Sequence, residues 1–200
     1  MKSLFIDTSS SNVTIKIIEN DNIVASFYDF IKDDISSKIL PIIESLFKEV
    51  NFKINEIQKI YVVNGPGSFT GIRIGVTIAK VLASQLNIEV CPISSLEYQA
   101  SGTDDSSIVL IDARRGFVYA GAYDSNLNCL LNDQYISYES IDFTLYNKVI
   151  SYDDFNSIKP TPDTLKIITK YKNKGINAHK LKPNYLKLTE AEEKLKDKND

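Results

Sequence analysis

Alternating apolar and polar positions at the start of the chain predict β-strands. The run 4–8 (LFIDT) is apolar until it ends in a polar turn, and alternation follows in 13–17 (VTIKI). A second turn at Asp21 and Asn22 precedes another apolar stretch over 23–30. Short alternating segments separated by polar turns are typical of antiparallel strands. Residues 1–30 therefore predict three antiparallel strands.

The next apolar residues recur at helical spacing and predict an amphipathic helix. They are Ile35, Ile39, Ile42, Ile43, Leu46, Phe47 and Val50, and Leu40 widens their stripe. A stripe of this width exceeds what one contact with a sheet requires. We therefore expect two covered sides on this helix, one against a sheet and one against a partner.

A series of strands and helices follows. The continuous apolar run 60–63 predicts a parallel strand that is buried on both faces. It leads through the loop 64–71 (NGPGSFTG) into a helix that continues to about Asn87. Residues 89–92 then predict a strand, and 94–100 predict a short helix. This order indicates an α/β fold.

A polar linker at 102–107 (GTDDSS) predicts a boundary between a first lobe, 1–103, and a second lobe, 104–200. Within the second lobe we expect strands at 134–138 and 148–152, a helix at 162–171, and a basic tail that is helical from Thr189 onward. The second lobe is therefore expected to be a shortened one.

The second lobe repeats the start of the first. In an alignment without gaps, Ile111 and Asp112 fall on Ile6 and Asp7, and strand patterns flank the Asp-containing turn each time. Internal similarity of this kind indicates a duplicated unit. We therefore expect each lobe to begin with the same hairpin.

Composition and charge narrow the classes of function. With 43% hydrophobic and 24% charged residues, the chain has the composition of a globular protein. The net charge is -3, but residues 1–165 carry 13 basic and 21 acidic residues, whereas 166–200 carry 10 basic and 5 acidic ones. Nucleic-acid affinity comes chiefly from Lys and Arg that neutralise phosphates. The acidic body therefore argues against a self-contained RNA-binding protein.

Histidine and cysteine are too few for several kinds of active site. His179 is the single histidine, and Cys91 and Cys129 lack CxxC spacing. A His-pair metal site cannot be built, and a Ser-His-Asp triad would need His179. We therefore expect no metal, no cofactor and no catalytic residue. No stretch approaches the roughly 18 apolar residues of a membrane span, so we also expect a soluble, cytoplasmic protein without a membrane contact.

The segment Asp7, Thr8 and Ser9 could form a phosphate-facing turn at a strand end. Turns of that kind need glycine where the backbone approaches the phosphate, and this segment has none. In the favoured alternative, Asp7 and Thr8 only close the turn through side-chain hydrogen bonds.

The loop 65–71 (GPGSFTG) places glycines and hydroxyl groups before a helix, as phosphate-binding loops do. It lacks the GxGxxG pattern, and Ile72 stands where a P-loop requires lysine. The favoured alternative is a packing role. The glycines permit a tight turn, while Gly71 and Gly75, four residues apart on one helical face, let another helix approach closely.

Arginine is rare, because the 23 basic residues include only Arg73, Arg114 and Arg115. All three lie in the two most distinctive segments of the chain. Arginine has a planar fork of donors that lysine lacks, so we expect it where bidentate geometry matters.

Three segments together resemble the TsaB family, also called YeaZ. They are 4–8, 64–80 (NGPGSFTGIRIGVTIAK) and 111–119 (IDARRGFVY), and the tail from Lys182 to Glu192 is similar to the end of the family. The residues that match the family motifs are Gly65, Pro66, Gly67, Ser68, Phe69, Thr70, Asp112 and Arg114. The family often carries a histidine before the LLP or ILP of the first long helix, where this chain has Ile35.

The resemblance implies the two-lobed fold of actin, Hsp70 and sugar kinases, with a duplicated strand-strand-strand-helix core and a shortened second lobe. It implies a noncatalytic scaffold and dimerization subunit in the synthesis of N6-threonylcarbamoyladenosine at position 37 of tRNA. The chain would not be an enzyme by itself. It would bind and position the catalytic paralogue TsaD and act with the ATPase TsaE. The alternative function is a nucleotide-dependent kinase or hydrolase of the same fold.

The resemblance also implies site residues. The partner-binding set is Ile39, Ile42, Ile43, Leu46, Gly71, Arg73, Gly75 and Thr77, and the vestigial phosphate-binding set is Asp7, Thr8 and Ser9. We expect a homodimer to form in the absence of the partner, and tRNA to be contacted mainly through the complex.

Overall fold

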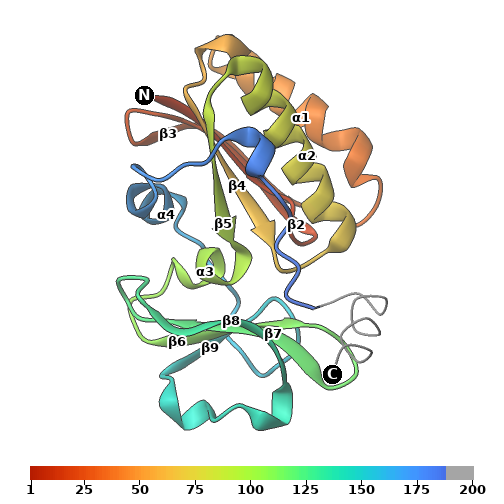
Figure 1. The fold of residues 1–200 in the computed structure, drawn as a ribbon, viewed down its shortest axis with the longest axis vertical. Coiled ribbons are helices and arrows are strands. Elements are labelled where there is room, and N and C mark those ends of the chain that lie inside the picture. The colour runs from red at the N-terminus through yellow and green to blue at the C-terminus, as the bar shows by residue number, and fades with distance from the viewer. Residues whose placement is uncertain (188–200) are drawn as a thin grey trace.

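Two β-sheets with helices between and beside them form the molecule, and the computed structural model describes residues 1–187 (Figure 1). The first sheet has the order β3-β2-β1-β4-β5. Its strands are β1 (Lys2–Asp7), β2 (Asn12–Glu19), β3 (Asn22–Phe30), β4 (Lys59–Gly65) and β5 (Glu89–Ser94). The first three strands are antiparallel, whereas β4 is parallel to both β1 and β5. The predicted strands and their directions are therefore confirmed.

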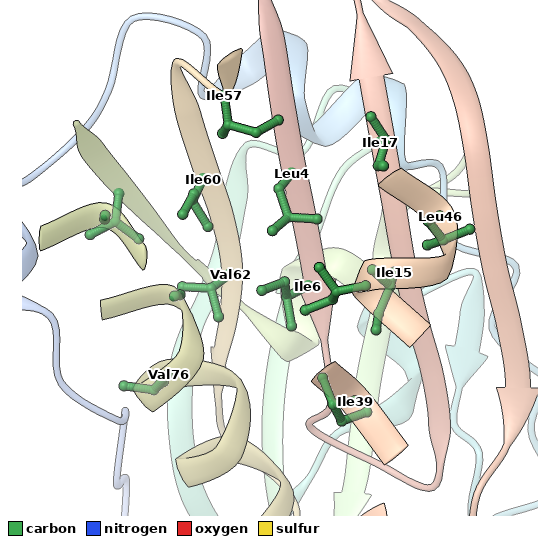
Figure 2. Packing of buried hydrophobic residues seen from close by; sticks show 14 of the residues in the cluster. Leu4, Ile6, Ile15, Ile17, Ile39, Leu46, Ile57, Ile60, Val62 and Val76 are labelled. Atoms are coloured by element: carbon green, nitrogen blue, oxygen red, sulfur yellow. The ribbon is translucent and has the colours of Figure 1, made fainter. Parts of the chain in front are cut away.

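Two long helices cover one face of the first sheet: α1 (Ile35–Glu49) and α2 (Phe69–Leu86). Figure 2 shows side chains of the sheet, among them Leu4, Ile6 and Val62, packed beneath Ile39 of α1 and Val76 of α2. These residues are almost fully buried. Burial of this apolar area is the main force that holds the helices on the sheet.

The opposite face of the first sheet is also covered. Phe5, Tyr61 and Val63 pack there with the short helices α3 (Ser95–Ala100) and α4 (Thr164–Lys170). In Figure 1, α3 lies between the two sheets. Coverage on both faces explains why the centre of β4, residues 60–63, lacks alternation and is continuously apolar.

The second sheet repeats the strand arrangement of the first. It has the order β8-β7-β6-β9, and its strands are β6 (Ser107–Asp112), β7 (Phe117–Tyr123), β8 (Cys129–Ser137) and β9 (Lys148–Ile150). β6 is antiparallel to β7 and parallel to β9, as β1 is to β2 and β4. Between β8 and β9 stand only the 3-10 turns η2 (Tyr138–Ser140) and η3 (Phe143–Leu145), where the first sheet has α1. The α/β fold with a shortened second lobe is confirmed. The predicted strand-strand-strand-helix unit is repeated only in its strands, because the second lobe lacks this helix, and its sheet has no counterpart of β5.

The end of the described chain returns to the first sheet. Ile176 forms a bridge with Val90 after α4, and Leu181 is buried in the core beneath α2. Two further 3-10 turns are η1 (Ile54–Glu56) and η4 (Ala178–Lys180). The division into domains at residue 103 stays a prediction, and the helix predicted from Thr189 lies outside the described residues. Among the described helices, none is long and apolar enough to cross a membrane.

Candidate functional site

The turn after β1 is closed by Asp7. Its Oδ1 accepts hydrogen bonds from the backbone N–H of Ser9 at 2.8 Å and from the Ser9 hydroxyl at 2.7 Å. Desolvation by burial raises the pKa of Asp7 to about 6, although both bonds from Ser9 oppose this shift. Asp7 therefore closes the turn through side-chain hydrogen bonds, as the favoured interpretation predicted.

The loop before α2 packs directly on this turn. Ser68 N–H donates to the Ser9 carbonyl at 2.7 Å, and the Thr8 hydroxyl donates to the Gly71 carbonyl at 2.7 Å. A Cβ at Gly67 would overlap the Ser9 carbonyl oxygen, and one at Gly71 would overlap the Thr8 carbonyl oxygen. Glycine is required here because two stretches of backbone meet. The packing role is confirmed, and Ser68 N–H is used within the protein.

The element that approaches the glycines of α2 is not another helix. Gly71 and Gly75 are buried, and a Cβ at Gly75 would overlap the hydroxyl oxygen of Thr8. Both glycines therefore face β1 of the same chain. Their assignment to a partner-binding face was wrong, because a glycine pair indicates close approach without identifying the element that approaches.

Other predicted partner-binding residues also lie inside. Ile39, Ile43 and Leu46 are at most 5% exposed and belong to the core beneath α1, while Ile42 is half-buried. The assignment of Ile39, Ile43 and Leu46 is corrected too, because these side chains are buried against the sheet, whereas the assignment of Ile42 stays a prediction. The outer side of the wide stripe is formed by Leu40, which is 56% exposed.

An open groove of about 450 Å³ lies between the outer sides of α1 and α2. It is lined by Ser36, Leu40, Phe69, Thr70, Arg73, Ile74, Thr77 and Ile78. We call this the helix groove. Of the predicted partner-binding residues, Arg73 and Thr77 line it. Ile74 and Ile78 also line it and were missed, although their i, i+4 spacing beside the glycines could have identified them.

Arg73 borders the helix groove and stacks on aromatic rings. Its guanidinium carbon lies 3.8 Å from the ring centroid of Phe69, and its Nε donates to the Tyr185 hydroxyl at 2.8 Å. The rings of Phe69 and Tyr185 are themselves stacked with centroids 5.7 Å apart. The planar group of Arg73 is therefore used for stacking, and it fixes the returning C-terminal segment beside α2.

A cleft of about 580 Å³ opens between the two sheets. It is lined by Ser9, Ser10, Ser11, Gly67, Ser68, Phe69, Gln99, Ile111, Asp112, Ala113, Arg114, Tyr119, Tyr152 and Asp153. We call this the interlobe cleft. It brings together Ser9 with the family-motif residues Gly67, Ser68, Phe69, Asp112 and Arg114. The two duplicated hairpins therefore face one cavity.

The second hairpin repeats the closure of the first. Asp112 Oδ1 accepts from the backbone N–H of Arg114 at 2.7 Å, and Asp112 N–H donates to Asp153 at 2.8 Å. Asp112 is exposed, unlike Asp7. In the described part of the chain, no group of three or more His, Cys, Asp or Glu side chains is placed to hold a metal ion.

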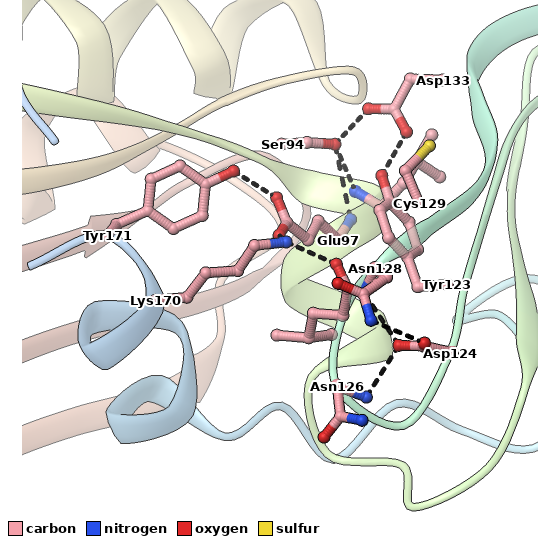
Figure 3. Close-up of polar contacts among 12 residues, drawn as sticks. Ser94, Glu97, Tyr123, Asp124, Asn126, Asn128, Cys129, Asp133, Lys170 and Tyr171 are labelled. Atoms are coloured by element: carbon pink, nitrogen blue, oxygen red, sulfur yellow. Dashed lines mark hydrogen bonds and ion pairs between the residues drawn. The ribbon is translucent and has the colours of Figure 1, made fainter.

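A polar cluster joins the two sheets (Figure 3). The hydroxyl groups of Ser94, at the end of β5, and Tyr123, on β7, both donate to Asp133 on β8. Burial raises the pKa of Asp133. On α3, Glu97 pairs with Lys170 of α4 at 2.5 Å. The bond from Ser94 ties β8 of the second sheet to the end of β5, and the Glu97–Lys170 pair ties α3 to α4.

Comparison with known proteins identifies the family. The family model of TsaD, tRNA N6-adenosine threonylcarbamoyltransferase, matches residues 31–187. The Bacillus subtilis tRNA threonylcarbamoyladenosine biosynthesis protein TsaB is 32% identical over 97% of this chain and 97% of its own length. This identity over nearly the full length places the chain among TsaB proteins.

Solved structures show the same fold. YeaZ from Pseudomonas aeruginosa has a TM-score of 0.79 at 21% identity, with 92% of this chain and 99% of that chain covered. A second Pseudomonas aeruginosa structure, described as similar to peptidase YEAZ, has a TM-score of 0.81 at 20% identity and covers 93% of this chain and 99% of that chain. The chain belongs to the TsaB (YeaZ) family of tRNA threonylcarbamoyladenosine biosynthesis proteins.

Proposed function

We propose that this chain is a noncatalytic scaffold subunit in the synthesis of N6-threonylcarbamoyladenosine in tRNA, and that it binds and positions a TsaD-type catalytic subunit. Membership of the TsaB family supports the pathway. The match to the TsaD family model over residues 31–187 supports a partner of related fold, because that range includes α1, α2 and the second sheet.

The helix groove carries this proposal. Leu40 and Phe69 are more than half exposed beside the half-buried Ile74 and Ile78. A contiguous exposed apolar surface of this kind usually marks a site of protein association. A TsaD-type protein with an equivalent helix pair could meet this face through a pseudo-two-fold axis, as like surfaces do in isologous contacts. The same symmetry supports a homodimer when the partner is absent.

The closed first hairpin supports the noncatalytic part of the proposal. Kinases and ATPases of other folds bind phosphates through free backbone N–H groups and bound metal ions. Here Ser68 N–H is bonded to Ser9, and the Asp7 carboxylate is buried and bonded to Ser9. The alternative function, a nucleotide-dependent kinase or hydrolase, would require this contact between loop and turn to open.

The other expected partners follow from the same complex. A TsaE-type ATPase would act with the pair, and tRNA would be contacted mainly through the catalytic subunit. We place this assembly in the cytoplasm.

The test is co-expression with the TsaD-type protein of the same genome, followed by size-exclusion chromatography. The variant Leu40→Asp places a charge in the helix groove and should abolish co-elution. Leu145→Asp is the matched control, because Leu145 is 67% exposed on the second lobe. It should leave co-elution unchanged. Co-elution of the Leu40→Asp variant at the level of the wild-type protein would contradict the proposal.

A further inference from the structure

The end of the described chain is rich in lysine and free of acidic residues. Residues 166–187 contain seven lysines and no Asp or Glu, whereas residues 1–165 carry 13 basic and 21 acidic residues. The helix α2 also contains no Asp or Glu. The surface that α2 shares with the last part of this stretch, residues 176–187, therefore receives only positive charges from both elements. We call residues 176–187 the returning segment.

The main chain of the returning segment is fixed against the first lobe, where the blue ribbon of Figure 1 passes α2. Lys80 of α2 donates through its Nζ to the carbonyls of His179 and Leu181 at 3.2 and 3.3 Å. Asn64, on β4, donates through its Nδ2 to the Lys182 carbonyl at 3.0 Å. These bonds use carbonyl oxygens of the segment, so they leave its lysine side chains at the surface.

Four lysines lie along this path without a counter-charge. Three of them are exposed and the fourth, on α2, is half-buried. None of the four forms a salt bridge with a described residue. We call them the basic seam: Lys80, Lys180, Lys182 and Lys187. The Nζ of Lys187 lies 5.2 Å from the ring centroid of Tyr135 on β8, so the seam extends from α2 to the second sheet.

The carboxylates near this stretch lie before the returning segment. Lys170 pairs with Glu97 at 2.5 Å, and Lys172 pairs with Asp21 at 2.8 Å. Glu89 of β5 lies against Gly175, since a Cβ there would come within 2.5 Å of its Oε2. The lysines before residue 176 are therefore partly neutralised, and the basic seam begins beyond them.

We propose that the basic seam binds the phosphate backbone of tRNA. Adjacent cations without counter-charges raise the local positive potential, and a row that crosses from one lobe to the other suits an extended polyanion better than a small anion. Lysine acts as a point charge, and contacts to phosphates carry no base sequence. The seam is therefore a positioning contact that any tRNA backbone satisfies.

That the polyanion is tRNA rests on the proposed function in tRNA modification. The outer side of α2 lines the helix groove, so a TsaD-type subunit docked there would lie next to the basic seam. Four phosphate contacts on an acidic protein give weak binding by themselves. Within one complex they add to the contacts of the catalytic subunit, because the second contact becomes intramolecular.

The test measures fluorescence anisotropy of a labelled tRNA with the full chain and with its complex with the TsaD-type subunit, over a range of salt concentrations. Replacing two lysines together, Lys180→Gln and Lys182→Gln, should weaken tRNA binding by the complex about tenfold at low salt. It should also reduce the slope of log affinity against log salt by about two. In the described part of the chain, these two lysines hold the returning segment through main-chain atoms, so the fold should remain intact.

The matched control replaces two lysines elsewhere, Lys48→Gln and Lys53→Gln. Both are exposed on the first lobe, and Lys48 is already paired with Glu44 at 2.6 Å. The net charge changes equally, yet tRNA affinity should stay within about twofold of the wild-type value. An equal loss in the control would overturn the proposal, because net charge alone would then explain the effect.

Two further results would overturn the proposal. One is an unchanged affinity and salt slope in the Lys180→Gln, Lys182→Gln variant. The other is tighter binding of the chain to phosphatidylglycerol vesicles than to tRNA in the same salt. This variant should still co-elute with the TsaD-type subunit, and Leu40→Asp should leave the weak tRNA binding of the isolated chain unchanged. The two proposals can therefore fail separately.

Discussion

The turns of the two duplicated hairpins are closed by the same hydrogen bond, but one turn is buried and the other is exposed. In each, an aspartate at the end of a strand accepts a hydrogen bond from the N–H two residues later, at 2.8 Å in the Asp7 turn and 2.7 Å in the Asp112 turn. Asp7 is 7% exposed, whereas Asp112 is exposed. The repeated sequence therefore determines the turn, and the surrounding elements determine what the turn can do.

The cause of the difference is α2. Its first turn lies on the first hairpin through Gly71, and the preceding loop bonds to Ser9 through Ser68. Around the second hairpin, Gly116 has open space where a Cβ would lie. The first hairpin is thus part of the packed interior, and the tip of the second is exposed. The predictions below test this difference, from the largest expected effect to the smallest.

A glycine-to-alanine substitution should cost more in α2, where it packs on the first hairpin, than at the tip of the second hairpin. Gly71→Ala drives a Cβ into the Thr8 carbonyl oxygen, so the free energy of unfolding should fall by about 3 kcal/mol. Gly116→Ala meets no atom within 4 Å and carries only the strain of its φ of +78°, so it should cost about 1 kcal/mol. Urea unfolding measures both. Equal costs would show that α2 does not constrain the first hairpin.

Asp7→Asn should stabilise the protein at pH 7 by about 2 kcal/mol, because it removes a buried charge and keeps an acceptor for Ser9. The pKa of Asp7 is about 6 in the folded state, above its ordinary value of 3.8. The loss of stability caused by the charged Asp7 carboxylate is therefore complete above about pH 6 and disappears as the pH falls toward 3.8. Wild type and variant should converge in stability over that window.

Asp112→Asn is the matched control for this prediction. Asp112 is exposed, so replacement should change stability by less than about 0.5 kcal/mol at any pH in the range. Thermal unfolding between pH 4 and 8, a range of about four units around the shifted pKa, measures both variants. A gain for Asp7→Asn that persists at pH 4 would contradict the assigned cause.

The smallest effect concerns the C-terminal segment, where Tyr185 contacts Phe69 and Arg73 in the first turns of α2. Tyr185→Phe removes the acceptor for Arg73 Nε but keeps the ring stack with Phe69, so stability should fall by about 0.5–1 kcal/mol. Tyr135→Phe, which keeps its stack with Phe117 on the second lobe, should change stability less. Indistinguishable results would mean that the Arg73 bond contributes nothing measurable.

Periodicity predicted the elements well because it reports burial directly. The helix expected from Ile35 is α1, Ile35–Glu49, and the helix expected to reach about Asn87 is α2, which ends at Leu86. Continuous apolar residues identified β4 as a parallel strand for the same reason. The sequence could not divide the wide stripe of α1 into its two sides, because Ile39 and Leu40 are both apolar and only the fold shows which one faces the sheet.

The site residues were harder to predict because they meet only after folding. Gln99, Tyr119 and Tyr152 line one cleft but come from α3, β7 and the segment after β9. None of these residues belongs to a spacing pattern that marks a ligand site. By contrast, Ser9, Asp112 and Arg114 were selected through local motifs, and the structure places all three at the interlobe cleft.

The central claim is that the outer face of α1 and α2 binds the TsaD-type subunit while the second hairpin stays open. Hydrogen exchange of the chain with and without that subunit, followed by mass spectrometry, tests it most directly. The account predicts slower exchange in peptides covering 36–46 and 69–81 and unchanged exchange in 112–119. Slower exchange in 112–119 with no change in the two helices would contradict it.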